Sequence, residues 1–332
     1  MKKLVVFVLI MAIIFVVVNS TVFAPRNPWQ IDLVLRDSKL SYWQEVEKGA
    51  RDAAKELNVT LNVFSIEYDN DYEAQISHLV AALNRKPDAL LVAPVHATRL
   101  NNALSNLAAA KIPVISLDSK LEWESAKSRI LSKNAQAMRM LGDQMLIHTG
   151  IEGKAVIISS DINSAVKERA QLLTEYLQQN SKITLDEYLD THIEAGLAYR
   201  KTQELLQAGK DVNIVIALDA RSTIEAAQAI AEHIEGQISD AAKDRSSKTP
   251  AATVPALYGF DCTNENAVYI ENDVIKSTIV QNPYVMGYLG VKTCFNILEG
   301  DSTPAIIYTP VITLTKANMF SGINQILQFS MD

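Results

Sequence analysis

The sequence has few of the residues that metal centres, redox sites and nucleic-acid-binding surfaces require. Its 332 residues include only two cysteines, Cys262 and Cys294, which form no CxxC motif and stand beside no histidine, so a zinc or redox site has no support. No run of five basic residues occurs, and the net charge is −7. Nucleic-acid binding is therefore not expected, because affinity for phosphates comes from clustered Lys and Arg. Whether the two thiols pair stays open.

Signatures of catalysis are missing as well. The chain has no GxSxG, HExxH or P-loop motif. Its five histidines fall mostly within or beside predicted helices and form neither a triad nor zinc-binding spacing, whereas nucleophilic catalysis needs a base oriented beside a nucleophile. We therefore expect no enzyme activity, no cofactor and no metal.

The first recognisable feature of the sequence is a predicted export segment at residues 1–24. Two lysines precede fifteen apolar residues, Leu4–Val18, and this order is typical of a secretory signal. Ala24 could end a cleavage site, but Pro25 would hinder a peptidase there. The stretch 4–24 is close to the roughly 20 residues that span a bilayer, so an uncleaved membrane anchor is favoured over a cleaved signal peptide. The positive-inside rule then places the rest of the chain outside the cytoplasm.

After this segment, short runs of Val, Ile and Leu alternate with amphipathic stretches, which is typical of a parallel sheet with crossover helices. About ten strands and eight helices exceed one ordinary open sheet, so two doubly wound α/β lobes are expected. Residues 235–255 are polar and rich in breakers, and predict a long surface loop. Strands are expected at 31–36, 60–66, 88–94, 112–118, 154–159, 183–190, 212–219, 254–261, 275–281 and 305–314.

Several predicted strands end in a polar residue, notably Arg36, Asp118, Asp219, Asp261 and Gln281. Ligands of open α/β sheets bind outside the carboxyl ends of the strands. Carboxylates that accept paired hydrogen bonds, together with an amide that both donates and accepts, suit a ligand with several hydroxyls. The alternative is that each Asp simply caps the next helix, although Gln281 before Asn-Pro would be a poor cap.

Tyr42 and Trp43 stand at the start of the first predicted helix. A core contact is the ordinary interpretation of a Trp at helical spacing. Two adjacent aromatics cannot both face the core, however, so at least one is expected at the strand-end side, where it could stack on a sugar ring.

These residues carry a family likeness. The stretches YWQEVEKGARDAAKELNV, ALLVAPVHATRL, KIPVISLDS, LYGFDCTNENAVYI and STIVQNPYVMGYLGVKTCFNILEG resemble the periplasmic-binding-protein type I superfamily, above all the ribose-binding-like sugar-binding proteins of ABC importers. The likeness runs from about residue 31 to about 314. It implies two lobes joined by three crossing strands, with lobes at 30–131 plus 282–309 and at 132–281 plus 310–332, and a sugar in the cleft.

The same resemblance implies a role for most of the polar strand ends. Tyr42 and Trp43 match the aromatic pair that packs on the sugar, Asp118 and Asp261 match two carboxylates, and Gln281 matches the glutamine of the second crossing. Asp219 stands where the family usually has Asn, and Lys167 where it usually has Arg.

The sequence also departs from the family pattern. Ser119 replaces an Arg, Ala93 an Asn, Lys133 an Asp, and Arg36 a small polar residue. Ribose itself is therefore not assumed.

The resulting prediction is an extracytoplasmic solute-binding protein that captures a monosaccharide or related polyol by lobe closure and presents it to an ABC permease. A membrane-anchored sugar sensor that signals to a histidine kinase is the alternative. A sugar-responsive repressor is excluded, because its DNA-reading helices would have to occupy the place of the membrane segment.

Overall fold

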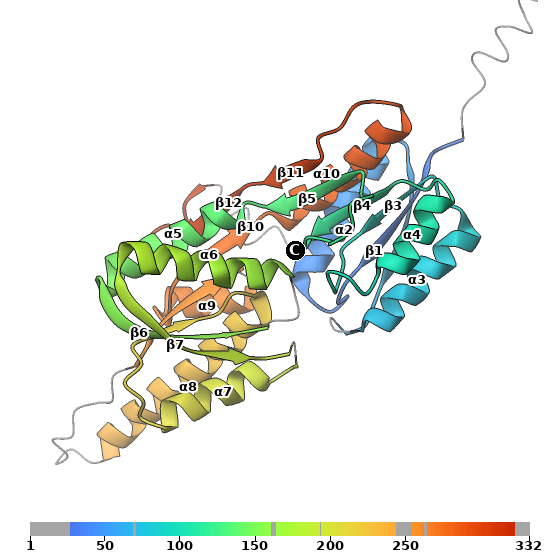
Figure 1. Cartoon of the computed structure of the whole chain (residues 1–332). Helices are drawn as coiled ribbons and strands as arrows, with labels where there is room; N and C mark the ends of the chain where they lie inside the picture. Colours follow the sequence, from blue (N-terminus) through green and yellow to red (C-terminus); the bar gives the residue numbers. More distant parts are fainter. Residues whose placement is uncertain are drawn as a thin grey trace, which may run out of the picture.

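The computed structural model describes residues 27–68, 71–160, 164–192, 194–243, 254–261 and 264–322. Both the predicted export segment 1–24 and Cys262 lie outside these residues. Within them, no helix has the length and apolar character needed to cross a membrane. The described chain forms two α/β lobes, each built on a six-stranded sheet with helices on both faces (Figure 1).

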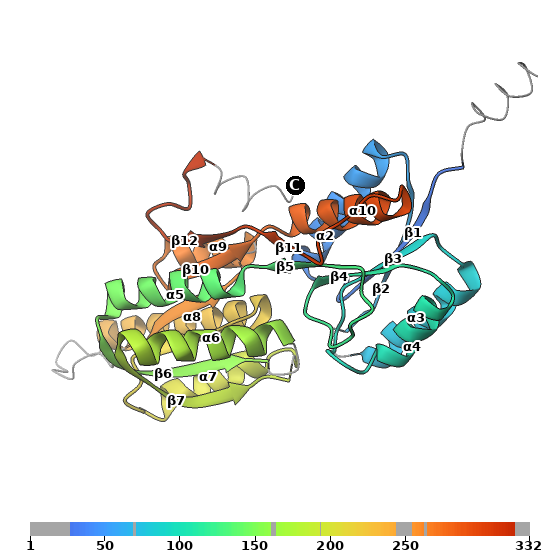
Figure 2. The ribbon, with the colours of Figure 1, turned by 45° about the horizontal axis from the view of Figure 1, so that its top comes forward.

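The first lobe contains a fully parallel sheet in the order β11-β5-β4-β3-β1-β2. Alternation along β1 sends Ile31, Leu33 and Leu35 to one face and Val34 to the other. Helices α2 and α10 cover the first face, and α3 and α4 cover the second (Figure 2). The strands are β1 (Gln30–Leu35), β2 (Thr60–Ser65), β3 (Ala89–Val92), β4 (Val114–Asp118), β5 (Ser128–Ser132) and β11 (Ile306–Thr309). The helices are α2 (Ser41–Glu56), α3 (Tyr72–Arg85), α4 (Asn101–Ala109) and α10 (Pro283–Leu298).

The second lobe repeats this plan in the order β12-β10-β9-β8-β6-β7, with β12 antiparallel to β10. Helices α5 and α6 cover one face of the sheet, and α7, α8 and α9 cover the other. The strands are β6 (Glu152–Ser159), β7 (Lys182–Asp190), β8 (Ile214–Ile216), β9 (Ala256–Phe260), β10 (Ile275–Gln281) and β12 (Val311–Leu314). The helices are α5 (Asn134–Thr149), α6 (Ser164–Asn180), α7 (Leu197–Gln207), α8 (Ala220–Lys243) and α9 (Asn264–Glu271).

Over the described residues the chain passes between the lobes three times: from β5 to α5, from β10 to α10, and from β11 to β12. At the second passage Asn282 caps α10, since its side chain accepts a hydrogen bond from the Val285 N–H, and Pro283 stands at the first helical position. The polar corner after β10 is thus the point where the chain changes lobe.

Four local predictions were wrong. The strand expected at 305–314 is two strands in different sheets, because Pro310 has no N–H to continue the ladder. β5 and α9 were not predicted, since each is short and weakly patterned. The loop expected from 235 onward is still helix as far as Lys243, because Glu, Gln, Ala and Lys there are good helix formers.

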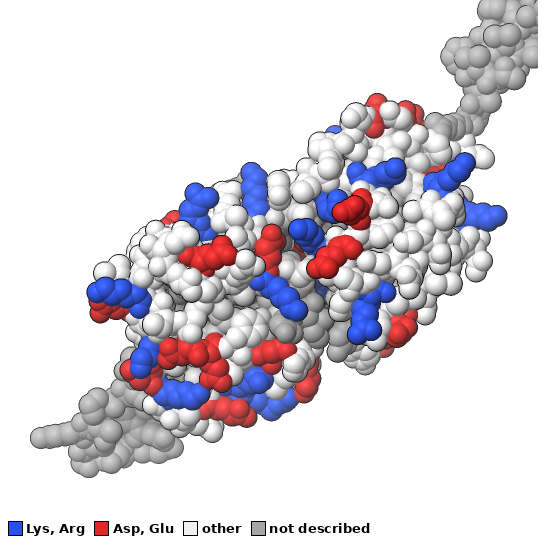
Figure 3. Space-filling model, in the orientation of Figure 1, with Lys and Arg blue, Asp and Glu red and all other residues white. Residues whose placement is uncertain are grey.

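The face of the molecule seen in Figure 3 carries Lys and Arg interspersed with Asp and Glu over both lobes. It has no broad area of positive charge, which agrees with the absence of basic runs in the sequence.

Candidate ligand-binding site

A cavity lies between the two lobes at the carboxyl ends of their strands. It contains about 560 Å³ of space unoccupied by protein atoms, part of it open to solvent. Its wall is made by Arg36, Leu40, Tyr42, Trp43, Asp118, Ser160, Val166, Arg169, Asp219, Ala220, Arg221, Asp261 and Gln281.

The aromatic wall comes from the start of α2. Tyr42 and Trp43 are both buried and both line the cavity, with ring centroids 4.9 Å apart in an edge-to-face arrangement. Each also packs into the core beneath α2, so the expectation that two adjacent aromatics could not both face the core was wrong. The Tyr42 hydroxyl donates to Asp118 Oδ1 at 3.1 Å, and burial, followed by the charges of Asp118 and Asp261, raises the pKa of this tyrosine. The hydroxyl therefore stays protonated and serves as a donor.

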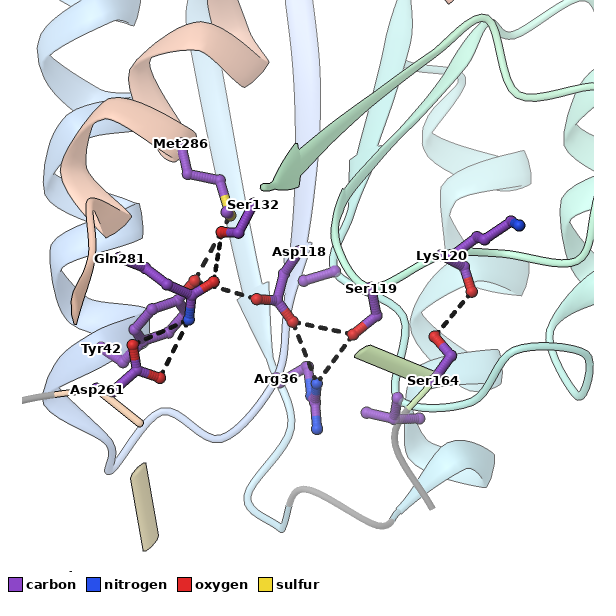
Figure 4. A network of polar contacts seen from close by, with 12 residues as sticks. Arg36, Tyr42, Asp118, Ser119, Lys120, Ser132, Ser164, Asp261, Gln281 and Met286 are labelled. Atoms are coloured by element: carbon purple, nitrogen blue, oxygen red, sulfur yellow. Dashed lines mark hydrogen bonds and ion pairs between the residues drawn. The ribbon is translucent and has the colours of Figure 1, made fainter. Parts of the chain in front are cut away.

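Asp118 ends β4 with its backbone in the left-handed region, at φ 63°, a conformation that Asp tolerates better than most residues. Its Oδ2 lies 3.6 Å from Arg36 Nη1 and accepts a hydrogen bond from Ser119 Oγ at 2.9 Å (Figure 4). The family resemblance implies an Arg at position 119, next to this carboxylate, where this chain has Ser. Arg36 places a guanidinium beside the same carboxylate from another strand end. The guanidinium also lies over the Trp43 ring, 5.4 Å from its centroid.

Asp261 holds the corresponding position after β9 of the second lobe, also left-handed, at φ 67°. Both of its oxygens accept from Gln281 Nε2, at 2.9 and 3.1 Å (Figure 4). Gln281 Oε1 in turn accepts from Ser132 Oγ at 2.5 Å and from Arg169 Nη2 at 3.3 Å. These partners fix the orientation of the amide, so Gln281 joins the two lobes and holds Asp261 in place.

Burial raises the pKa of Asp261 to about 6, although Arg169 and the Gln281 amide oppose the shift; the charge of Asp118 adds to it. Only 8% of Asp261 is exposed. A buried carboxylate of this kind gains from additional hydrogen-bond donors, because they stabilise its charged form. Ligand hydroxyls are such donors.

Asp219 lines the cavity but serves chiefly as a helix cap. Its Oδ1 accepts from the Ser222 N–H at 2.8 Å, and its Oδ2 accepts from the Ser159 and Ser222 hydroxyls at 2.5 and 2.8 Å. The Ser160 N–H is also within reach of Oδ2, at 3.2 Å. The capping alternative therefore describes Asp219 well, and less of its carboxylate is available to a ligand than the sequence suggested.

The structure places Lys167 away from the cavity in which the sequence predicted it. Its side chain is exposed on α6 and does not line the cavity; its charge helps lower the pKa of His96, which burial lowers most. The cavity receives Arg169 instead, which is buried and lies over the Phe260 ring at 3.6 Å from its centroid. Val166, Arg169, Leu173 and Leu177 share the buried stripe of α6, so helical spacing could have identified Arg169.

The structure thus brings seven of the eight predicted side chains to one cavity, all except Lys167. Ser160, Arg169 and Arg221 are polar lining residues that sequence reasoning missed. No cluster of three or more His, Cys, Asp or Glu suited to a metal ion occurs in the described part of the chain. Cys294 is buried in α10, and burial raises the pKa of its thiol; Cys262, its possible partner, lies outside the described residues.

Two α/β lobes joined by three crossings, with a polar cavity at the junction, define a type I periplasmic binding protein fold. Residues 31–302 match the family model described as a periplasmic binding protein domain. The chain therefore belongs to this family, and the fold and family predicted from the sequence are confirmed.

The relatives are sugar-binding proteins. The ribose import binding protein of Haemophilus influenzae is 24% identical, over 80% of this chain and 84% of that protein. The D-allose-binding periplasmic protein of Escherichia coli is 22% identical, over 89% and 90%. A carbohydrate transporter solute-binding protein of Agrobacterium radiobacter, solved in complex with D-arabinose, is similar with a TM-score of 0.80 and 25% identity, over 90% of this chain and 98% of that one.

Proposed function

We propose that this protein is an extracytoplasmic solute-binding protein that captures a monosaccharide or related polyol by closing its lobes and presents it to an ABC sugar importer. The observation that carries this proposal is the cavity itself, because two carboxylates at equivalent strand ends of opposite lobes face one space beside an aromatic pair. Binding rather than catalysis follows from the family, whose named members here are sugar-binding proteins.

The charges around the cavity favour a neutral ligand. Arg36 lies beside Asp118, and Arg169 offsets the burial of Asp261. Asp219 accepts hydrogen bonds at the start of α8, where the helix dipole favours a negative charge. Because these charges are already balanced within the protein, a hydroxyl-bearing neutral sugar or polyol fits better than a sugar acid or an amino sugar.

We assign ligand contacts to Arg36, Tyr42, Trp43, Asp118, Asp261 and Gln281, with Arg169 in the place given to Lys167 and with Asp219 acting mainly through its cap. The lobes are taken as 30–131 plus 282–309 and 132–281 plus 310–332. An ABC permease is the favoured partner, because the relatives include import proteins; the sensor-kinase alternative is less favoured. Anchoring by residues 4–24 rests on the sequence alone.

The test is a thermal-shift screen of the full chain against pentoses, hexoses, deoxy and amino sugars, sugar acids and polyols. A ligand present at a hundred times its dissociation constant adds about 2.7 kcal/mol to stability, so a true ligand raises the melting temperature clearly. We expect a hit among the neutral sugars or polyols. A panel without any hit would refute sugar binding, and a hit confined to sugar acids would refute the charge argument.

A further inference from the structure

Arg221, the second residue of α8, belongs to the cavity wall and also reaches across the cleft. Its Nη2 lies 2.9 Å from Oδ2 of Asp37, which follows β1 in the opposite lobe. The other Asp37 oxygen accepts from the Lys39 N–H at 2.8 Å, so the carboxylate is held in place from its own lobe. This ion pair is well shielded on the acidic side, because the Asp37 side chain is only 4% exposed.

A second polar contact joins the lobes near the cavity. Ser164 Oγ, at the start of α6, donates to the Lys120 carbonyl oxygen at 3.0 Å (Figure 4). The two contacts start from different helices of the second lobe and end on different strand-end loops of the first. The lobes therefore contact each other through polar groups at two different strand-end loops of the first lobe.

One N–H group of the Arg221 guanidinium makes no hydrogen bond to the described part of the protein. Its Nε is buried and has no hydrogen-bond partner among the described residues. A buried donor without a partner is destabilising, and most such groups in proteins find one. Arg221 also stands in the first turn of α8, where the helix dipole disfavours a positive charge. The ion pair with Asp37 offsets this cost through Nη2, whereas the Nε–H still has no partner among the described residues.

We infer that Arg221 couples lobe closure to ligand binding: its Nη2 holds Asp37 across the cleft, while its Nε–H donates to a ligand oxygen. The ligand oxygen would be a hydroxyl or ring oxygen of the neutral sugar or polyol, so this half of the inference rests on the proposed function. The ion pair with Asp37 does not, because both of its partners belong to the protein. Neither residue is among those that the sequence motif indicated.

Two substitutions separate the two interactions. Asp37→Asn removes the charge that faces Arg221 while keeping Arg221 itself. Arg221→Lys keeps a cation within reach of Asp37 but has no Nε–H, because Lys carries a single terminal ammonium. Asp211→Asn is the matched control, since it removes the exposed 3.1 Å ion pair with Lys154 within one lobe, away from the cleft.

The first measurement is small-angle X-ray scattering of the ligand-free full chain, which reports lobe opening whether or not a sugar has been found. We expect a larger radius of gyration for Asp37→Asn than for the wild type, and wild-type values for Arg221→Lys and for the control. An unchanged radius for Asp37→Asn would overturn the contact across the cleft, independently of the proposed function.

The second measurement is calorimetric titration with the sugar or polyol from the thermal screen. We expect each of the two cleft variants to bind about tenfold more weakly, since partly exposed charge pairs and single hydrogen bonds are of this size, with the control unchanged. Wild-type affinity in Arg221→Lys would overturn the ligand contact. Equal losses in Asp37→Asn, Arg221→Lys and their double variant would also overturn it, because one shared interaction would then explain all three.

Discussion

At the scale of single residues, the centre of the site is a buried carboxylate that the protein only partly stabilises. Asp261 accepts two hydrogen bonds from Gln281 and has Arg169 nearby, yet burial still raises its pKa to about 6. The surroundings therefore hold the side chain in position without fully replacing its lost hydration. Donors from a ligand would complete that replacement, which makes Asp261 the side chain most dependent on ligand.

Removing this carboxylate should abolish ligand binding while the fold remains intact. We expect Asp261→Ala to weaken affinity at least about 100-fold, because hydrogen bonds to charged groups contribute about 1.5–3 kcal/mol each. Calorimetric titration measures the affinity, and circular dichroism checks the fold. Asp261→Asn tolerates the left-handed backbone and isolates the charge, while Asp301→Ala removes an exposed carboxylate as a control. Undiminished affinity in both Asp261 variants would show that the ligand lies elsewhere.

The raised pKa of Asp261 also predicts a pH dependence. Below about pH 6 the carboxyl is protonated and offers weaker acceptors, so affinity should fall by up to about tenfold per pH unit as the pH drops through this value. In Asp261→Asn this dependence should disappear. Titrations of both proteins between pH 4.5 and pH 8 provide the measurement, and parallel profiles would exclude Asp261 as the titrating group.

Stability should change in the opposite direction. The folded state binds the Asp261 proton more tightly than the unfolded state does, so the free energy of unfolding falls as the pH rises from about 4 to about 6. The full shift corresponds to on the order of 3 kcal/mol. Asp261 therefore lowers stability at neutral pH, although it is a residue to which we assign a contact with the ligand.

How far the site could be read from the sequence depends on the side chain. Asp118, Asp261 and Gln281 end predicted strands, and strand ends are recognisable from the hydrophobic pattern. Arg169 and Lys167 are two residues apart on a helix, and only helical phase decides which of them is buried. Arg221 and Asp37 come together from different lobes, so no local pattern could have paired them.

At the scale of elements, the aromatic wall depends on the close approach of α2 and α10. A Cβ at Gly287 would lie 1.9 Å from the Val46 carbonyl oxygen, and a Cβ at Gly49 would lie 2.0 Å from that of Tyr284. Both obstacles are backbone atoms, which cannot move away without moving a helix. The two glycines therefore set the helix separation, and with it the position of Tyr42 and Trp43.

We expect Gly287→Ala to lower the free energy of unfolding by about 2 kcal/mol, because overpacking forces backbone shifts of that cost. It should also weaken ligand binding, since α2 carries the aromatic pair. Gly236→Ala is the matched control: it lies in α8 with open space around it and should be neutral or stabilising by up to about 1 kcal/mol. Urea denaturation measures the free energy of unfolding of both variants. A Gly287→Ala protein as stable as the wild type would disprove the close-packing account.

Element boundaries show why part of the fold escaped prediction. Strands of the sheet centres are continuous apolar runs and were located within a few residues. β5 has only Ile130 and Leu131 as large apolar residues, so its place in the sheet comes from pairing with β4 and β11, which lie elsewhere in the chain. Pro310 can be recognised in the sequence as a residue that interrupts a strand. That the chain changes from one sheet to the other at this point is a property of the tertiary fold.

At the scale of the whole molecule, the proposed anchoring by residues 4–24 can be tested by mass measurement. If residues 4–24 are an uncleaved anchor, the protein recovered from membranes should keep the full 36.6 kDa mass of the chain. Cleavage after Ala24 would leave a shorter chain in the soluble extracytoplasmic fraction. Intact-mass spectrometry of both fractions distinguishes these outcomes, and a truncated species alone would rule out the anchor.

The second crossing, from β10 to α10, has a consequence for the order of folding. The first lobe is complete only when α10 and β11 are in place, and these follow almost the whole second lobe in the chain. An N-terminal domain usually folds while the rest of the chain is still being made. The first lobe cannot do so. The first lobe must wait for residues 283–309, and such distant pairings form slowly. We therefore expect the two lobes to fold together rather than one after the other.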